Sequence, residues 1–441
     1  MGYIPEHLLE NLRNYKYRGA DKSLVSRYVL NPFWNWFVTL WPLSVAPNTV
    51  RVSNVATNRA AADLSLKITL TGLSIIIFNF ATLIYYDPLY LVERDGYPEP
   101  PHWVYFTWGI GLFLYQTLDA IDGKQARRTG MAGPLGEMFD HGCDALNTTL
   151  GCLLANRALG LGRSWWTVAS QIATLANFYL TTWEEYHTGV LFLGYFSGPV
   201  EGILMIVVIY FITGIFGPSI WEHKIWTVLH LEHVSYLKKV PNIPLNKALI
   251  VFAIIGLAVN IFHSYLNVRQ ASRSSFGRPR QNSSYPPLVL LLPFVASTAI
   301  QVAWLSHPEY NNSYIINSAS FVPFVLAWGF QFAHQVGRMI LAHVTSAPFP
   351  LFDWIWIWSI IGAVDANLPH LIGRPPIFQT SPRHTAYVVW ATLIISMLAY
   401  ARFVTLVIRD ITNYLGIACF TVRKKDEHGV WKSAQPEAKM L

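Results

Sequence analysis

Charged side chains are scarce in this chain, where Asp, Glu, Lys and Arg together supply 13% of the 441 residues. A soluble protein carries roughly a quarter charged residues. The mean hydropathy is +0.32, and 53% of the residues are hydrophobic. These values argue against an ordinary soluble enzyme and indicate a protein with several membrane-spanning helices.

Cysteine is also scarce, and the chain has only Cys143, Cys152 and Cys419. Two of the three lie in apolar segments, so the sequence offers neither a disulfide framework nor a zinc site. The N-terminus carries five charged residues in its first eighteen and is too polar for a cleaved signal peptide. We therefore expect membrane insertion to use internal helices.

A nucleic-acid partner is not expected. No segment alternates Lys or Arg with aromatic residues on a polar face. The net charge of +7 fits basic cytoplasmic loops facing an anionic lipid leaflet better than it fits nucleic-acid binding.

Apolar segments and aromatic residues are abundant, with 17 Trp, 22 Tyr and 25 Phe. A span needs about 20 mainly apolar residues. On this criterion the fold class is all-α, a polytopic membrane protein with about ten transmembrane helices. The predicted spans are 68–86, 103–121, 135–157, 165–183, 200–220, 247–267, 286–305, 315–337, 351–372 and 385–407.

Lys and Arg placement predicts the orientation, because cytoplasmic loops are enriched in these residues. The N-terminal arm, the loop after residue 121, the loop around residues 269–280 and the C-terminal tail are basic and predicted to be cytoplasmic. Residues 221–246 also carry lysines but fall on the lumenal side.

The chain divides into five segments. These are a cytoplasmic N-terminal arm with an interfacial helix (1–49), an atypical insertion (50–67), catalytic helices (68–267), additional transmembrane helices (268–407) and a cytoplasmic tail (408–441).

Four carboxylates stand between two apolar runs. Asp119 and Asp122 are three residues apart, and Asp140 and Asp144 are four apart, so each pair falls on one face of a helix. Ionised carboxylates at the edge of a hydrocarbon layer are costly unless a cation occupies the site. Oxygen ligands of this kind suit Mg²⁺ or Mn²⁺.

The complete spacing is Asp-x2-Asp-Gly-x2-Ala-Arg-x8-Gly-x3-Asp-x3-Asp, and eight fixed positions fall within 26 residues. It resembles the signature of the CDP-alcohol phosphotransferases. The surrounding sequence, including Asp140-His-Gly-Cys-Asp144, resembles that of the eukaryotic, fungal-like choline and ethanolamine phosphotransferases. The similarity extends over nearly the whole chain.

The resemblance implies the fold of that family and transfer of phosphocholine or phosphoethanolamine from CDP-choline or CDP-ethanolamine to diacylglycerol. It also implies a homodimer among membrane lipids of the endoplasmic reticulum or Golgi, with the site facing the cytoplasm. Two Mg²⁺ or Mn²⁺ ions would stabilise the charge that develops on the phosphates. Their expected ligands are Asp119, Asp122, Asp140 and Asp144.

Substrate-binding roles follow from residue size and charge. Gly123, Gly136 and Ala126 would let the nucleotide approach the helix backbones. Arg127 and Lys124 would face phosphate oxygens. Asn48 resembles a position that helps to hold the nucleotide, and Glu201, Trp183 and Tyr186 are candidates for the headgroup ammonium. For His334, Arg338 and His343 we expect polar packing or lipid-phosphate contact.

The general base is either Asp144 or His141. The last Asp is the choice that the general family pattern implies, whereas a histidine with a pKa near neutrality suits proton transfer. We favour His141, with Glu137 orienting it.

The insertion departs from the family pattern. Eighteen residues, Val50 to Lys67, separate Thr49 from Ile68, and their removal leaves an uninterrupted helix start. A Val codon begins with GT and a Lys codon can end in AG. We hypothesise a short in-frame intron retained in the gene sequence.

Two alternatives stay open, and they differ in class. An ion-coupled transporter could use the four Asp as a cation pathway, although Gly123, Arg127 and Gly136 have no role there. A phosphotransferase for another acceptor, such as inositol or glycerol phosphate, would keep the chemistry. The sequence does not decide between choline and ethanolamine.

Overall fold

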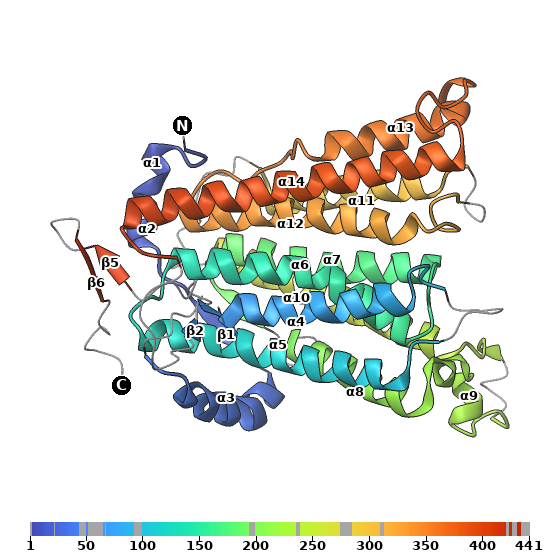
Figure 1. The fold of residues 1–441 in the computed structure, drawn as a ribbon, viewed down its shortest axis with the longest axis horizontal. Helices are drawn as coiled ribbons and strands as arrows, with labels where there is room; N and C mark the ends of the chain where they lie inside the picture. Colours follow the sequence, from blue (N-terminus) through green and yellow to red (C-terminus); the bar gives the residue numbers. More distant parts are fainter. Residues whose placement is uncertain are drawn as a thin grey trace, which may run out of the picture.

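A computed structural model describes residues 2–21, 23–43, 50–51, 65–66, 68–91, 99–193, 199–234, 239–273, 285–308, 313–419, 423–425 and 430–433. The long helices run side by side along the longest axis of the molecule (Figure 1). Both chain ends lie at one end of this bundle, together with α1, α2, α3, β5 and β6. That end also holds the turn between α5 and α6.

Ten helices of fourteen or more residues occur in the described part of the chain, and each overlaps one predicted span. They are α4 (Ile68–Tyr86), α5 (His102–Arg128), α6 (Pro134–Ala158), α7 (Trp165–Thr188), α8 (Pro199–Phe216), α10 (Leu245–Arg273), α11 (Leu292–Leu305), α12 (Phe321–Thr345), α13 (Trp356–Ile372) and α14 (Pro382–Leu415).

The remaining elements are short. They are α1 (Glu6–Leu9), α2 (Asn11–Asn14), β1 (Gly19–Asp21), a π-helical turn (Ser26–Leu30), α3 (Asn31–Phe37), β2 (Val50–Arg51), β3 (Ser65–Leu66), β4 (Leu191–Leu193), α9 (Ile225–Val228), β5 (Arg423–Lys425), β6 (Trp431–Ser433) and 3₁₀ turns at Val38–Leu40, Pro218–Glu222 and Pro287–Leu291. The all-helical prediction is therefore confirmed in its main content.

Four helical segments are long and apolar enough to cross a membrane, namely Ile68–Tyr86, Leu245–Arg273, Pro287–Leu305 and Pro382–Leu415. The remaining long helices are either shorter or carry polar residues that face the interior of the bundle. In α12, for example, Gln331, His334 and Gln335 are all buried. These buried polar side chains lower the hydropathy of α12 without shortening the helix.

Packing between helices places the site-bearing segment at the centre. α5 packs against α4 and α8, and α6 packs against α4, α7 and α12. The main hydrophobic core runs between these helices and includes Trp108, Leu153, Leu175, Tyr210 and Phe332. Buried side chains thus surround the two helices that carry the motif.

The N-terminal arm forms helical structure where the interfacial helix was predicted, over Ser26–Phe37. Trp34 is buried against α5, whereas Trp36 and Leu40 are exposed. Before this helix, β1 pairs in parallel with β4, which ties the arm to the end of α7. Location of this helix at a membrane surface stays a prediction.

The insertion lies mostly outside the described residues. Its two ends are described, and they form a two-stranded antiparallel pair in which Val50 faces Leu66 and Arg51 faces Ser65. The chain therefore returns to the point from which it departed before α4 begins.

Candidate active site

The motif folds as a helix, a tight turn and a second helix. α5 ends at Arg128, Gly130 adopts a φ of 66°, and the amide of Met131 donates to the carbonyl of Ala126 at 2.9 Å. This is a glycine-based helix termination. Pro134 then begins α6, a position where proline costs no hydrogen bond. The short turn brings the ends of both helices together.

Three motif carboxylates converge between α5 and α6. Asp119 of α5 and Asp140 and Asp144 of α6 each offer an oxygen, and these oxygens lie within 4.8 Å of one another. Asp140 also forms a side-chain contact within hydrogen-bonding reach of both Asp119 and Asp122. Carboxylates this close must share a proton or a cation, because like charges repel.

Neighbouring hydroxyls hold the outer members of the set. The Thr69 hydroxyl of α4 donates to Asp122 Oδ2 at 2.6 Å, and the Tyr115 hydroxyl donates to Asp144 Oδ1. By contrast, Oδ1 of Asp119 and Oδ1 of Asp140 are buried without a hydrogen-bond partner among the described residues. Within the described ranges, no Lys or Arg forms an ion pair with any of the four. Among the described residues, the four acids are therefore not part of a salt-bridged network.

The donor set fits a divalent metal ion. Several carboxylate oxygens, two of them without a partner, and no nitrogen or sulfur donor among the three convergent residues form the ligand type that hard cations prefer.

The two motif glycines border open space. Among the described residues, a Cβ built on Gly136 would meet no atom within 4 Å, and one on Gly123 would meet only Arg127 Nη1 at 3.8 Å. Ala126 is buried and its carbonyl caps the turn. The described part of the chain thus leaves space beside the backbone at both glycines.

The two motif cations differ in position. Arg127 is exposed, and it interacts electrostatically with Tyr17 of the N-terminal arm. Lys124 instead donates from Nζ to Oδ1 of Asn31 at 3.1 Å and to Oδ1 of Asn35 at 2.9 Å, both on α3. The structure therefore engages Lys124 in packing of the N-terminal arm.

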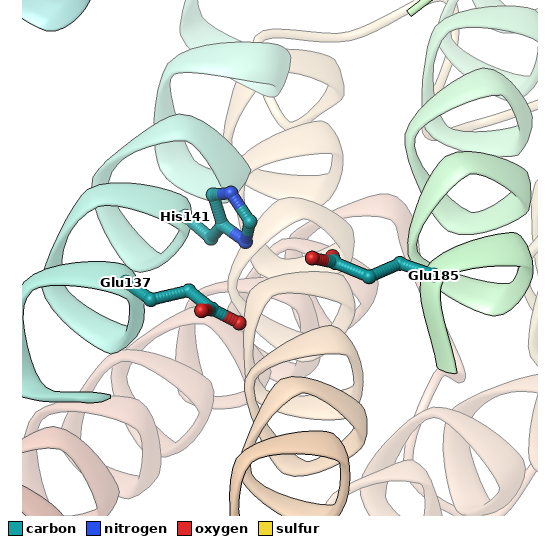
Figure 2. Close-up of side chains that lie close together, drawn as sticks. All are labelled: Glu137, His141 and Glu185. Carbon is teal, nitrogen blue, oxygen red and sulfur yellow. The ribbon is translucent and has the colours of Figure 1, made fainter. Parts of the chain in front are cut away.

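A second cluster occupies the adjacent face of α6. Glu137 and His141, one turn apart on α6, and Glu185 of α7 point toward one another (Figure 2). One ligand atom from each lies within 4.8 Å of the others, a spacing that would also accommodate a metal ion. All three side chains are buried, and the Tyr15 hydroxyl donates to Glu137 Oε2. His141 is thus positioned with the predicted orienting residue, Glu137.

Tyr17 links the two clusters. Partial burial raises the pKa of its hydroxyl well above the ordinary value, and the neighbouring carboxylates of Glu185, Asp140 and Asp119 raise it further. Arg127 acts in the opposite direction. The N-terminal arm therefore runs beside both acidic groups.

The predicted headgroup residues have partners elsewhere. Trp183 Nε1 donates to the carbonyl of Pro287 at 3.0 Å, and the Tyr186 hydroxyl donates to the carbonyl of Ala347 at 3.1 Å. Glu201 Oε1 accepts from the Ser23 hydroxyl of the arm. Asn48 lies outside the described residues.

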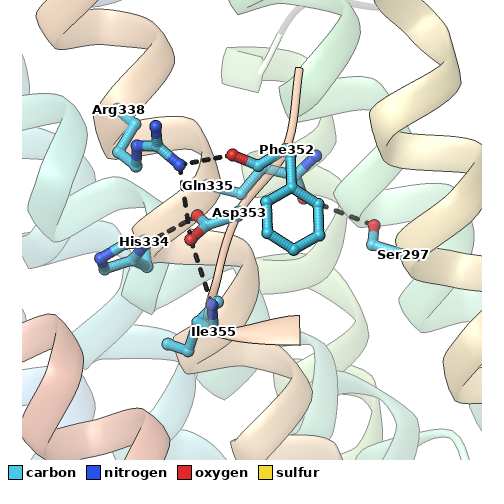
Figure 3. Close-up of polar contacts among 7 residues, drawn as sticks. All are labelled: Ser297, His334, Gln335, Arg338, Phe352, Asp353 and Ile355. Atoms are coloured by element: carbon cyan, nitrogen blue, oxygen red, sulfur yellow. Dashed lines mark hydrogen bonds and ion pairs between the residues drawn. The ribbon is translucent and has the colours of Figure 1, made fainter. Parts of the chain in front are cut away.

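His334 and Arg338 form part of a separate polar cluster on α12 (Figure 3). His334 Nδ1 lies 2.7 Å from Asp353 Oδ2, and Arg338 Nη1 donates to the carbonyl of Phe352 at 2.7 Å. These contacts fix the segment between α12 and α13, as expected for polar packing. His343 is buried against the Tyr15 ring.

Sequence reasoning did not single out Glu185, Tyr15, Tyr115 or Thr69. The sequence does contain a signal for Glu185, because Glu184 and Glu185 are adjacent acids at the end of an apolar run. Tyr15 and Thr69 lie in segments remote from the motif, and only the fold brings them to it. Tyr115 lies one turn before Asp119 on α5, but the sequence does not show that its hydroxyl reaches Asp144 of α6.

The fold combines helices apolar enough to span a membrane with a helix-borne acidic centre. The sequence profile of the CDP-alcohol phosphatidyltransferase family matches residues 63–271. The chain is 35% identical over 432 residues to cholinephosphotransferase 1 of Saccharomyces cerevisiae, covering 96% of this chain and 99% of that protein.

Two further relatives show the same extent of similarity. Choline/ethanolaminephosphotransferase 1 of Saccharomyces cerevisiae is 34% identical over 435 residues, covering 96% of this chain and 99% of its own. Choline/ethanolaminephosphotransferase 1 of Arabidopsis thaliana is 34% identical over 441 residues, covering 97% and 100%. The chain belongs to the CDP-alcohol phosphatidyltransferase family, an enzyme family that uses divalent metal ions. The predicted family and enzyme class are confirmed.

Proposed function

We propose that this chain transfers phosphocholine, phosphoethanolamine or both from the CDP-alcohol to diacylglycerol, releasing CMP. The observation that carries the proposal is the convergence of Asp119, Asp140 and Asp144 beside the open backbone of Gly136. Relatives with these activities in their names align over nearly the full chain.

The reaction is a displacement at phosphorus. The diacylglycerol hydroxyl oxygen bonds to the phosphorus next to the amino-alcohol, and the bond from that phosphorus to the bridging oxygen breaks. CMP leaves with the electron pair of the broken bond. The hydroxyl proton goes to a base, for which His141 is our choice and Asp144 the alternative.

Asp119, Asp122, Asp140 and Asp144 would hold two divalent cations, Mg²⁺ or Mn²⁺. When bound, such ions neutralise charge on the attacked and leaving phosphates. Asp122 and Asp144 are held in place by the Thr69 and Tyr115 hydroxyls, so these carboxylates need little reorganisation to bind.

Each remaining motif residue has a binding role in this proposal. Gly123, Ala126 and Gly136 admit the nucleotide, Arg127 pairs with its phosphates, and Glu201 attracts the headgroup ammonium. Lys124 contributes indirectly, because its ammonium holds α3 of the N-terminal arm through Asn31 and Asn35.

Ten spans, a cytoplasmic site, a homodimer and residence in the endoplasmic reticulum or Golgi belong to the same proposal. The ten long helices run along one axis, and the motif turn lies at the bundle end where both basic termini lie, which supports a common side (Figure 1).

A radiolabel assay tests the function. Purified protein in diacylglycerol-containing liposomes is incubated with labelled CDP-choline or CDP-ethanolamine, with Mg²⁺, with Mn²⁺ or with EDTA. We expect labelled phospholipid and CMP only when a divalent cation is present. Product from inositol or glycerol phosphate would instead favour the other acceptor class, and the absence of CMP from every donor would contradict the proposal.

A further inference from the structure

The buried acid Glu185 has no assigned role, yet it faces a catalytic side chain. It lies near the end of α7 and is 2% exposed. Its carboxylate points toward His141 of α6 from the side opposite the body of that helix, while Glu137 approaches from below the ring in Figure 2. All three groups offer atoms within 4.8 Å of one another.

α6 separates two functions on adjacent faces. Asp140 and Asp144 form one row and Glu137 and His141 form another, because residues four apart on a helix share a face. Consecutive residues on a helix are about 100° apart, so Asp140 can face the motif helix while His141 faces α7. Contacts of α6 with both α5 and α7 agree with this division.

Glu185 has a matched neighbour with a different task. Glu184 is equally buried, but its Oε1 accepts a hydrogen bond from Asn267 of α10 at 2.7 Å. Two consecutive acids on α7 therefore face different helices, one toward α10 and the other toward His141. Within the described part of the chain, neither forms an ion pair with Lys or Arg.

We propose that Glu185 is a positioning residue for His141, acting with Glu137 to fix the plane and the protonated nitrogen of the imidazole. The inference rests on the proposed function, in which the ring receives the diacylglycerol proton as the new oxygen–phosphorus bond forms and CMP departs. A carboxylate that accepts from one ring nitrogen leaves the other nitrogen aimed at the reacting hydroxyl.

Anchoring of Glu137 makes this arrangement rigid. The Tyr15 hydroxyl donates to Glu137, and the Tyr15 ring packs edge-on against His343 with centroids 5.9 Å apart. Glu137 is thus held by the N-terminal arm, which itself packs against α12, whereas Glu185 belongs to α7.

The test uses full-length protein and three single variants, Glu185→Gln, Glu184→Gln and His141→Ala, together with the double variant of His141 and Glu185. kcat and KM are measured for both CDP-alcohols. Loss of a group that orients another typically costs about 10–100-fold in activity. We expect Glu185→Gln to lower kcat by that factor with KM unchanged, and Glu184→Gln to behave as wild type.

The double variant separates positioning from general packing. Because Glu185 acts through His141, adding Glu185→Gln to His141→Ala should cost no further activity. A raised KM with kcat intact would make Glu185 a substrate contact and overturn the inference. Equal losses from Glu184→Gln, or additive losses in the double variant, would also overturn it, as would a bound metal ion that Glu185→Gln alone removes.

Thermal unfolding in detergent of the wild-type protein, Glu185→Gln, His141→Ala and the double variant tests the contact without an activity measurement. Non-additive midpoint shifts for Glu185 and His141 support the inference, and additive shifts contradict it. If wild-type protein releases no CMP while the shifts are non-additive, the proposed function fails and the contact between the two residues stands.

Discussion

The Thr69 hydroxyl of α4 donates a hydrogen bond to Oδ2 of Asp122 on α5 at 2.6 Å. Thr69 stands in the first turn of its helix, two residues after the atypical insertion. The start of α4 therefore helps to position a motif carboxylate, and a substitution at Thr69 should change how Asp122 is oriented.

Replacing Thr69 by Val should weaken metal binding. The substitution keeps the side-chain shape but removes the hydroxyl that orients Asp122, and loss of such a group typically costs 10–100-fold in metal affinity or activity. We expect the Mg²⁺ concentration for half-maximal CMP release to rise by about tenfold. Thr71→Val is the control, because the buried Thr71 hydroxyl has no partner among the described residues. An unchanged Mg²⁺ requirement in Thr69→Val would contradict the assignment of Asp122.

Gly136→Ala should separate stability from substrate binding. The added Cβ meets no atom of the described residues within 4 Å, and alanine stabilises a helix by about 0.5–1 kcal/mol relative to glycine. We expect thermal stability to be maintained or raised while KM for CDP-choline rises, because the methyl group enters the space reserved for nucleotide. On the same helix, a Cβ on Gly151 would meet Asn147 Oδ1 at an ordinary 3.7 Å, so Gly151→Ala serves as control. A Gly136→Ala enzyme with an ordinary KM would show that the nucleotide binds elsewhere.

Arg127 and Lys124 should contribute unequally. A hydrogen bond between charged partners contributes about 1.5–3 kcal/mol, so Arg127→Gln should raise KM for the CDP-alcohol by at least about tenfold. Lys124→Gln should chiefly lower thermal stability, because Lys124 bonds to Asn31 and Asn35. Steady-state kinetics and thermal unfolding of both variants measure the change in KM and the change in stability, respectively. The reverse ranking of the two KM values would place Lys124, and not Arg127, on the phosphates.

Much of the site could be predicted from spacing, because helical periodicity is local. The faces shared by Asp119 with Asp122 and by Asp140 with Asp144 follow from intervals of three and four residues. Partners from distant segments could not be predicted, since nothing in the sequence places Tyr15 beside Glu137 or Glu185 beside His141. For Lys124, charge suggested phosphate binding, yet tertiary packing provides two amide acceptors on α3.

The positions of the long helices could also be predicted from hydropathy, but the number of membrane spans could not. α4 matches its predicted range at both ends, whereas α8 ends at Phe216, four residues before the predicted boundary. In α12, buried polar side chains lower the apolar signal that defines a span, although the helix is 25 residues long. Hydropathy depends only on the identity of the side chains, so it does not distinguish a helix surrounded by lipid from one surrounded by other helices.

Removal of residues 50–67 should leave a folded, active enzyme. The ends of the insertion already pair through Val50 and Leu66, so joining Thr49 to Ile68 spans a short distance. If the segment is an intron, transcripts will lack it, and the shortened protein will release CMP at least as fast as the longer one. Peptides from the native protein that span residues 52–64, or an inactive deletion variant, would identify the segment as a genuine part of the enzyme.

Asp140→Asn and Asp122→Asn should abolish turnover without unfolding the chain. Loss of charge stabilisation worth several kcal/mol corresponds to a rate reduction on the order of a hundredfold or more. Glu222→Gln, an exposed acid far along the sequence from the motif, is the control. Size-exclusion elution and thermal midpoint establish folding, and labelled CMP release reports activity. A folded Asp140→Asn protein with full activity would remove Asp140 from the metal site.

Direct counting of bound Mn²⁺ by electron paramagnetic resonance tests the metal centre itself. Wild-type protein titrated with Mn²⁺ in the presence of CDP-choline should bind about two ions per chain, and Asp140→Asn should lose at least one of them. Equal Mn²⁺ binding by the two proteins, or none by either, would show that the convergent carboxylates hold no catalytic metal.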